Sequence, residues 1–195
     1  MLKALLELLV PSCCAGCGEP GDALCPPCSV DMTSLMPVRR RNGLPPMYAL
    51  AEYSGAARRA VIAYKERGRR ELAAHFGSLL AEALARLPTA AVVPVPSRPA
   101  AFRQRGYDHM RLIAEAMAAP VRPVLKLDRR VKDSVGLDPD QRMRNLAGRL
   151  RCTPIREKVV LIDDVITTGA TAAACCAALT NAGAKVVGVL ALTAT

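Results

Sequence analysis

The stretch that most constrains the fold of this 195-residue chain is VVLIDDVITTGAT, residues 159–171. Its first four residues are apolar and mostly β-branched, which is typical of a strand buried on both faces of a parallel sheet. The Ala-rich run that follows predicts a helix closed by Gly183. The chain therefore passes from the end of a strand into the start of a helix, which is where open α/β sheets bind ligands.

The turn between this strand and this helix has the composition of a phosphate site. Thr167, Thr168 and Thr171 supply hydroxyl donors. Gly169 allows the backbone to take a positive φ and to approach a phosphate closely. Unpaired N–H groups and the positive end of the helix dipole also favour an anion there.

Two consecutive acids, Asp163 and Asp164, stand between the strand and the turn. They cannot bind a phosphate, but they suit the vicinal hydroxyls of a sugar or a hydrated Mg²⁺. A Walker B strand also ends in acids, but it requires a Gly-rich phosphate loop ending in Lys and Ser or Thr, which the sequence lacks. An ordinary αβ loop with polar residues is the other alternative. Together, the strand, the acids and the turn predict a sugar-phosphate site.

Residues 159–171 resemble the signature of the type I phosphoribosyltransferases, whose substrate is 5-phosphoribosyl-1-pyrophosphate (PRPP). The resemblance implies an α/β fold, with a mainly parallel sheet flanked by helices, and Mg²⁺ bound with PRPP. It also implies that the catalytic residues Asp163 and Asp164 contact the ribose hydroxyls. The residues that it implies for the 5′-phosphate are Thr167, Thr168, Gly169, Ala170 and Thr171.

Residues 13–28 contain two C-x2-C pairs in Gly- and Pro-rich turns. The four cysteines are Cys14, Cys17, Cys25 and Cys28. This arrangement predicts a small zinc-binding element, and four thiolates leave no open position for catalysis, so the zinc is expected to be structural. An iron–sulfur cluster and disulfides are the alternatives. Cys13 is a fifth cysteine in this stretch, and it can replace Cys14 as a ligand.

A Pro- and Arg-rich tract at residues 37–46 interrupts the periodicity and predicts a domain boundary. We expect residues 1–43 to hold an N-terminal helix and the zinc knuckle, and residues 44–195 to form the phosphoribosyltransferase-like domain. The first ten residues are apolar but too short to span a bilayer, and no small-residue cleavage site follows them. A cytoplasmic protein is therefore expected.

Before the acid pair, the sequence predicts a strand at 47–53, helices at about 55–67 and 70–87, and a strand at 91–95. Lys65 follows an apolar helix face, so it is a candidate contact for the substrate or a lysine that extends to solvent. A strand at 121–127 and a last strand, KVVGVLALTA, complete the sheet.

A basic loop at residues 96–106, followed by a helix at 107–118, again joins a strand to a helix start. Arg103 and Arg105 are the residues that we expect to bind a pyrophosphate. Asp108 and His109 suit either an acid–base pair or a capping Asp followed by a partly buried His.

The order of four motifs resembles that of the ComF family of competence-associated proteins: a cysteine knuckle, a VPVP strand, an RG helix start and the PRPP motif. The sequence departs from that pattern at Asp108 and His109, where many members carry Asn and Gln. The resemblance implies a role in DNA uptake, with single-stranded DNA and a DNA-uptake helicase as partners. The net charge of +10 and the pI near 9.6 agree with an anionic partner, either PRPP or nucleic acid.

The basic segment before the acid pair resembles the mobile hood of these transferases, which closes over the ligand and excludes water. Its candidate contacts are Lys132, Arg142, Arg144 and Asn145, which otherwise solvate a flexible loop. A short helix is expected from Asp138 to Leu146. Two hypotheses follow from the whole sequence: an enzyme that transfers phosphoribose from PRPP, or a non-catalytic DNA-binding protein with a regulatory PRPP site.

Overall fold

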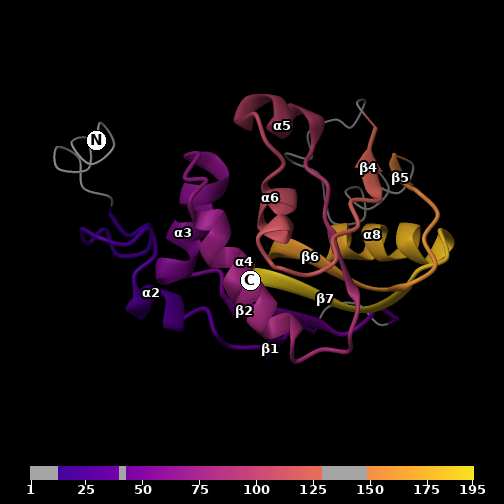
Figure 1. Cartoon of the computed structure of the whole chain (residues 1–195), viewed down its shortest axis with the longest axis horizontal. Helices are drawn as coiled ribbons and strands as arrows, with labels where there is room; N and C mark the ends of the chain where they lie inside the picture. The colour runs from indigo at the N-terminus through magenta and orange to yellow at the C-terminus, as the bar shows by residue number, and fades with distance from the viewer. Residues whose placement is uncertain (1–12, 40–42, 129–148) are drawn as a thin grey trace.

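The structure is a computed structural model that describes residues 13–39, 43–128 and 149–195. Within these residues a five-stranded sheet with the order β1-β2-β7-β6-β3 forms the centre of the molecule (Figure 1). Its strands are β1 (Met36–Pro37), β2 (Met47–Glu52), β3 (Ala91–Pro94), β6 (Lys158–Ile166) and β7 (Lys185–Ala194). The pairs β2–β7, β7–β6 and β6–β3 are parallel, and β1 pairs antiparallel with β2. The predicted α/β class with a mainly parallel sheet is confirmed.

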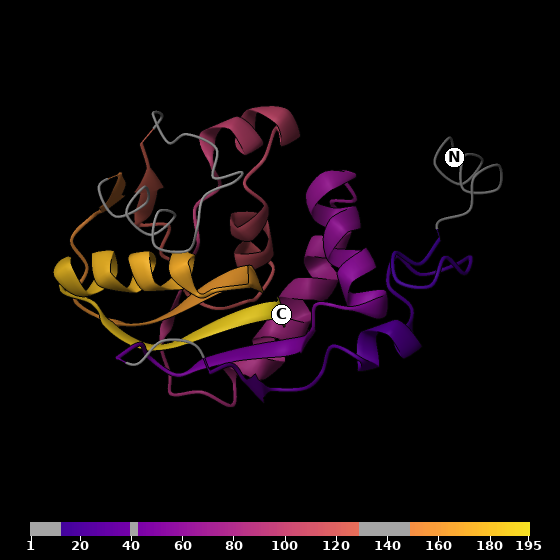
Figure 2. The same cartoon turned by 180° about the vertical axis from the view of Figure 1, so that it is seen from behind.

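The helices cover both faces of the sheet, because β6 and β7 carry apolar side chains on each face (Figures 1 and 2). On one face Val160 and Ile162 pack with the residues of three helices, and on the other Val159 and Leu161 pack with those of α8. The helices of the first face are α3 (Gly55–Glu66), α4 (Leu72–Leu84) and α6 (His109–Glu115), and α8 is Ala170–Asn181.

Two short strands and two short helices complete the described elements. The strands β4 (Leu125–Leu127) and β5 (Leu150–Cys152) form an antiparallel pair beside α8. Helix α2 (Pro26–Val30) lies within the cysteine-rich segment, residues 13–32, and α5 (Pro99–Arg105) follows β3. No helix among the described residues is both long enough and apolar enough to cross a membrane.

Three expectations about local structure are corrected. The predicted loop at 96–106 contains α5, because Pro99 fits the first turn of a helix and Gly106 ends it at a φ of 77°. The helix expected at 107–118 is shorter, since Asp108 is its N-cap and it ends at Glu115. The strand expected at 121–127 is limited to β4, and Pro123 lies before it.

The cysteine-rich segment packs against the main sheet and its helices. Leu24, Cys28 and Met32 belong to the same apolar core as Tyr64 and Phe76. The strand β1, which precedes the expected boundary at residues 43 and 44, pairs with β2 of the main sheet. The division into 1–43 and 44–195 stays a prediction.

Several sequence expectations lie outside the described residues. They are the N-terminal helix, the helix from Asp138 to Leu146, and the hood residues Lys132, Arg142, Arg144 and Asn145.

Candidate functional site

A pocket of about 400 Å³ opens at the C-terminal ends of β3 and β6. The helix that packs after β3 lies on one face of the sheet and the helix after β6 lies on the other, so the crevice is at the topological switch point where such sheets bind ligands. The volume suits a small-molecule ligand. The polar and charged residues that line it are Lys65, Ser97, Arg98, Arg105, His109, Asp163, Asp164, Thr167 and Thr171.

The turn from β6 into α8 forms one wall of this pocket. Thr167 and Thr171 line the pocket, and Gly169 is the N-cap of α8 with a φ of 76°. The Thr168 Oγ1 accepts a hydrogen bond from the Ala170 N–H at 3.4 Å, so this hydroxyl supports the turn itself. Of the five predicted phosphate residues, two thus face the pocket directly and three shape the turn.

The acid Asp163 lies on the sheet face that carries α8. Its Oδ1 accepts a hydrogen bond from the Asp164 N–H at 2.8 Å. Burial, followed by the negative charge of Asp164, raises the pKa of Asp163 to about 8. Asp163 therefore carries a proton at neutral pH in the protein without ligand.

Its neighbour Asp164 lies on the opposite face, because successive side chains of a strand alternate. Its Oδ2 accepts from Lys65 Nζ at 2.5 Å and lies 3.0 Å from His109 Nε2, while its Oδ1 accepts from the Val165 N–H at 2.7 Å. Burial alone would raise the pKa of Asp164, but the hydrogen bond from His109 and the charge of Lys65 hold it well below its usual value. Asp164 is therefore ionised.

Lys65, which was expected to contact the substrate or to extend to solvent, lies at the pocket and forms an ion pair with Asp164. Burial alone would lower the pKa of Lys65, but the charge of Asp164 and the hydrogen bond to it raise this pKa. The lysine and the acid thus keep each other charged.

Ser97, in the loop after β3, joins several pocket residues by hydrogen bonds. Its Oγ lies 2.9 Å from His109 Nδ1 and 3.1 Å from Asp108 Oδ1, and it accepts from Arg105 Nη2 at 3.3 Å. Asp108 also caps α6 by accepting from the Arg111 N–H. Ser97 was not among the predicted site residues, although it follows the end of β3, the strand that pairs with the acid-bearing β6.

The two arginines expected to bind a pyrophosphate occupy different places. Arg105 lines the pocket, and its Nε is buried without a partner among the described residues, which suits an additional acceptor such as a bound anion. Arg103 lies in a neighbouring groove with Phe102, whose side chain is 47% exposed. Arg98, which was not among the predicted site residues, lines the main pocket.

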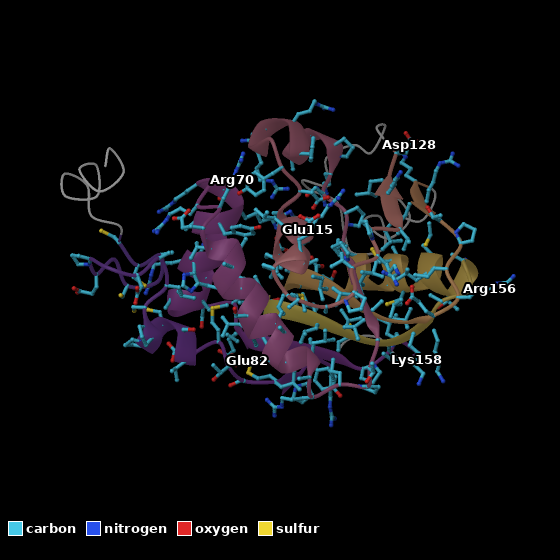
Figure 3. All side chains as sticks on the ribbon, viewed as in Figure 1. Arg70, Glu82, Glu115, Asp128, Arg156 and Lys158 are labelled. Carbon is cyan, nitrogen blue, oxygen red and sulfur yellow. The ribbon has the colours of Figure 1, made fainter. Side chains whose placement is uncertain are left out.

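A second groove, of about 600 Å³, adjoins the pocket and shares Lys65 and Arg105 with it. Arg67 and Tyr107 also line this groove. The guanidinium of Arg70 lies 4.3 Å from the centre of the Tyr107 ring, at the end of α3 that is nearest α5 (Figure 3). Three cations, Lys65, Arg67 and Arg105, therefore line this groove together with the acid Glu66.

The four predicted zinc ligands, Cys14, Cys17, Cys25 and Cys28, lie together, with their sulfur atoms within 4.8 Å of one another. Four sulfur atoms at this spacing can bind one metal ion tetrahedrally. Burial would raise the pKa of Cys14, but hydrogen bonds from the N–H groups of Cys25, Cys17 and Gly16 lower it to about 6. A thiolate, which is the form that binds a metal, is therefore favoured at Cys14.

Two arginines hold the cysteine-rich segment against α3 and the loop that follows it. Arg59 donates to the Gly16 carbonyl, and Arg69 Nη1 donates to the Cys13 carbonyl at 2.6 Å. Cys13 is exposed and does not belong to the four-cysteine cluster. The buried Cys175 and Cys176 of α8 also lie outside it and pack in the apolar core.

Comparison of the sequence with protein-family models and with curated proteins gave no match.

Proposed function

We propose that the pocket at the ends of β3 and β6 binds PRPP with Mg²⁺, as the site of a phosphoribosyltransferase-like protein. The observation that carries this proposal is that the acid pair and the threonine turn, which are adjacent in sequence, line one pocket together with cations from α3 and α5. Membership of the ComF family is part of the proposal and is supported by the order of the four sequence motifs.

Each part of PRPP has suitable partners in the pocket. The ribose hydroxyls donate to Asp163 and Asp164, and the 5′-phosphate accepts from Thr167, Thr171 and the first N–H groups of α8. The pyrophosphate lies toward Arg105, whose buried Nε has no partner among the described residues. Mg²⁺ bound with PRPP would neutralise the negative charge of the leaving pyrophosphate.

Titration calorimetry with PRPP and Mg²⁺ tests the proposal. We expect the wild type to bind, and the Asp163→Asn, Asp164→Asn double variant to lose at least about tenfold in affinity, which is 1.4 kcal/mol. Thr167→Val is a second variant, since its exposed side chain can be replaced without loss of a core contact. Glu115→Gln is the control, because Glu115 forms an exposed ion pair with Arg111. Absence of PRPP binding by the folded wild type would refute the proposal.

A second candidate function, binding of single-stranded DNA, is favoured by one surface feature. Phe102 is exposed beside Arg103 on α5, and base stacking on an aromatic ring with a cation nearby is the usual mode of such binding. The affinity for an oligonucleotide should fall steeply with salt, and Phe102→Ala should cost about 1–3 kcal/mol. Val30→Ala, at another exposed apolar side chain, is the control. An affinity that is independent of salt would exclude this function.

A further inference from the structure

A row of hydrogen bonds leads from the buried acid Asp164 through His109 to Ser97 at the pocket. His109 Nε2 lies 3.0 Å from Asp164 Oδ2, and His109 Nδ1 lies 2.9 Å from Ser97 Oγ. Asp164 and His109 are only 5% and 6% exposed, whereas Ser97 is half-buried and lines the pocket. Ser97 is therefore the member of the row that a ligand meets most easily.

The direction of these hydrogen bonds follows from the charge of Asp164. An ionised carboxylate only accepts hydrogen bonds, so His109 donates from Nε2. A neutral imidazole then has its lone pair at Nδ1, where it is one of two acceptors for the single proton of the Ser97 hydroxyl. The other acceptor is Asp108 Oδ1, 3.1 Å from Ser97 Oγ, whereas His109 Nδ1 is nearer at 2.9 Å. Arg105 Nη2 donates to the same hydroxyl oxygen at 3.3 Å, so the hydroxyl proton stays available for these two acceptors.

The charged groups around His109 come from each element packed against it and balance one another. Asp164 of β6 and Asp108 at the start of α6 are acids, and Lys65 of α3 and Arg105 of α5 are cations. Tyr64 of α3 is close to the imidazole ring, and its hydroxyl donates to the His109 carbonyl at 2.6 Å. An imidazolium formed here would be stabilised by the adjacent Asp164.

We propose that His109 is the general base of this pocket, and that Ser97 carries the proton to it from the acceptor substrate. This inference rests on the proposed function. As the acceptor atom bonds to C1 of the ribose, the C1–O bond breaks and its electron pair leaves with pyrophosphate. The acceptor's proton passes to Ser97 Oγ while the Ser97 proton passes to His109 Nδ1. The imidazolium later returns this proton to solvent.

This proton relay, from the acceptor through Ser97 to His109, also indicates the class of the acceptor. A nucleophile that is already anionic needs no base, whereas a hydroxyl, a water molecule or an amide-type N–H must lose a proton as it attacks. The site therefore suits an acceptor that keeps its proton at neutral pH. The usual Asn and Gln of the ComF pattern cannot accept a proton in this way, so the relay would be a property of chains with His at this position.

Release of pyrophosphate from PRPP, with water as the acceptor, tests the relay. In His109→Gln we expect the rate at saturating PRPP to fall about 100-fold or more, with the PRPP affinity unchanged. Ser97→Ala, at a half-buried position, should reproduce the loss. His75→Gln, at the other histidine of the chain, is the control.

The outcomes separate this relay from PRPP binding itself. Binding with equal release by wild type and His109→Gln, or binding without any release, overturns the relay and leaves the PRPP site intact. Failure of the wild type to bind PRPP overturns the proposed function and the relay with it. Nitrogen NMR of the two imidazoles gives a ligand-free check, because a neutral His109 protonated at Nδ1 instead of Nε2 also overturns the relay.

Discussion

Two adjacent carboxyl groups, Asp163 and Asp164, differ in charge because they point to opposite faces of one strand. Asp164 has Lys65 and His109 as partners, whereas Asp163 has a backbone N–H and the repulsion of its neighbour. The sequence alone predicts that both acids lie at the site. It does not predict their charges, because these depend on groups that α3 and α6 bring from elsewhere in the chain.

This difference predicts a pH dependence of stability. The pKa of Asp163 rises from 3.8 to about 8 on folding, so between these values the folded protein holds a proton that the unfolded chain has released. The contribution of Asp163 to the free energy of unfolding therefore falls as pH rises, by at most about 1.4 kcal/mol per pH unit. Urea unfolding should show that Asp163→Asn gains stability relative to wild type between about pH 5 and 7.5.

Asp164→Asn is the matched comparison and should behave in the opposite way. The pKa of Asp164 is lowered on folding, so its contribution is present above its unfolded value and is lost as pH falls. We expect this variant to be less stable at neutral pH, by about 1–3 kcal/mol, because a buried hydrogen-bonded charge is removed. Equal pH profiles for the two variants would contradict the charges assigned to the pair.

The cysteines also differ at the scale of single residues. Cys13 and Cys14 are adjacent in sequence, but only Cys14 lies in the four-cysteine cluster. Cys14→Ser should therefore reduce the zinc content measured by elemental analysis, and Cys13→Ser should leave about one zinc per chain. Iron with visible absorbance would instead indicate an iron–sulfur cluster. Absence of any metal would contradict the assignment of the four cysteines as a structural metal site.

At the scale of elements, the turn between β6 and α8 depends on one left-handed residue. Gly169 has a φ of 76°, where a side chain costs about 1–2 kcal/mol. Gly169→Ala should lower the free energy of unfolding by this amount and weaken PRPP binding by tilting the phosphate turn. Gly188→Ala is the control, since its added Cβ would lie 3.6 Å from the nearest atom, an ordinary contact. Equal PRPP affinity in Gly169→Ala would show that the turn does not hold the phosphate.

The same elements show what a sequence can predict. The strand β6 and the helix α8 were predictable because a buried apolar run and an Ala-rich run are local signals. The apolar pattern does not predict helix α5, because its Arg and Gln residues give no apolar period, although Pro99 and Gly106 mark its ends. The meeting of Lys65, Ser97 and His109 was not predictable, since it depends on how α3, the loop after β3 and α6 pack.

At the scale of the whole molecule, the cysteine-rich segment shares its apolar core with the sheet and helices. Met32 is fully buried in the same core as Tyr64 and Phe76, and Arg59 and Arg69 hold this segment from the α3 side. Loss of a metal from the four cysteines should therefore also destabilise the sheet and the helices that share this core. This packing would couple the small N-terminal element to the helix that carries Lys65.

Removal of the metal with a chelator should lower the melting temperature of the entire protein in one transition. Near-ultraviolet circular dichroism follows the buried Tyr64, and its signal should be lost together with the far-ultraviolet helix signal. Met32→Ala should cost about 2–5 kcal/mol of global stability, as a core truncation does. Val30→Ala, at an exposed position two residues earlier, should change it by less than about 0.5 kcal/mol. Two separate transitions would instead show that the cysteine-rich element unfolds independently, as a boundary near residue 43 predicts.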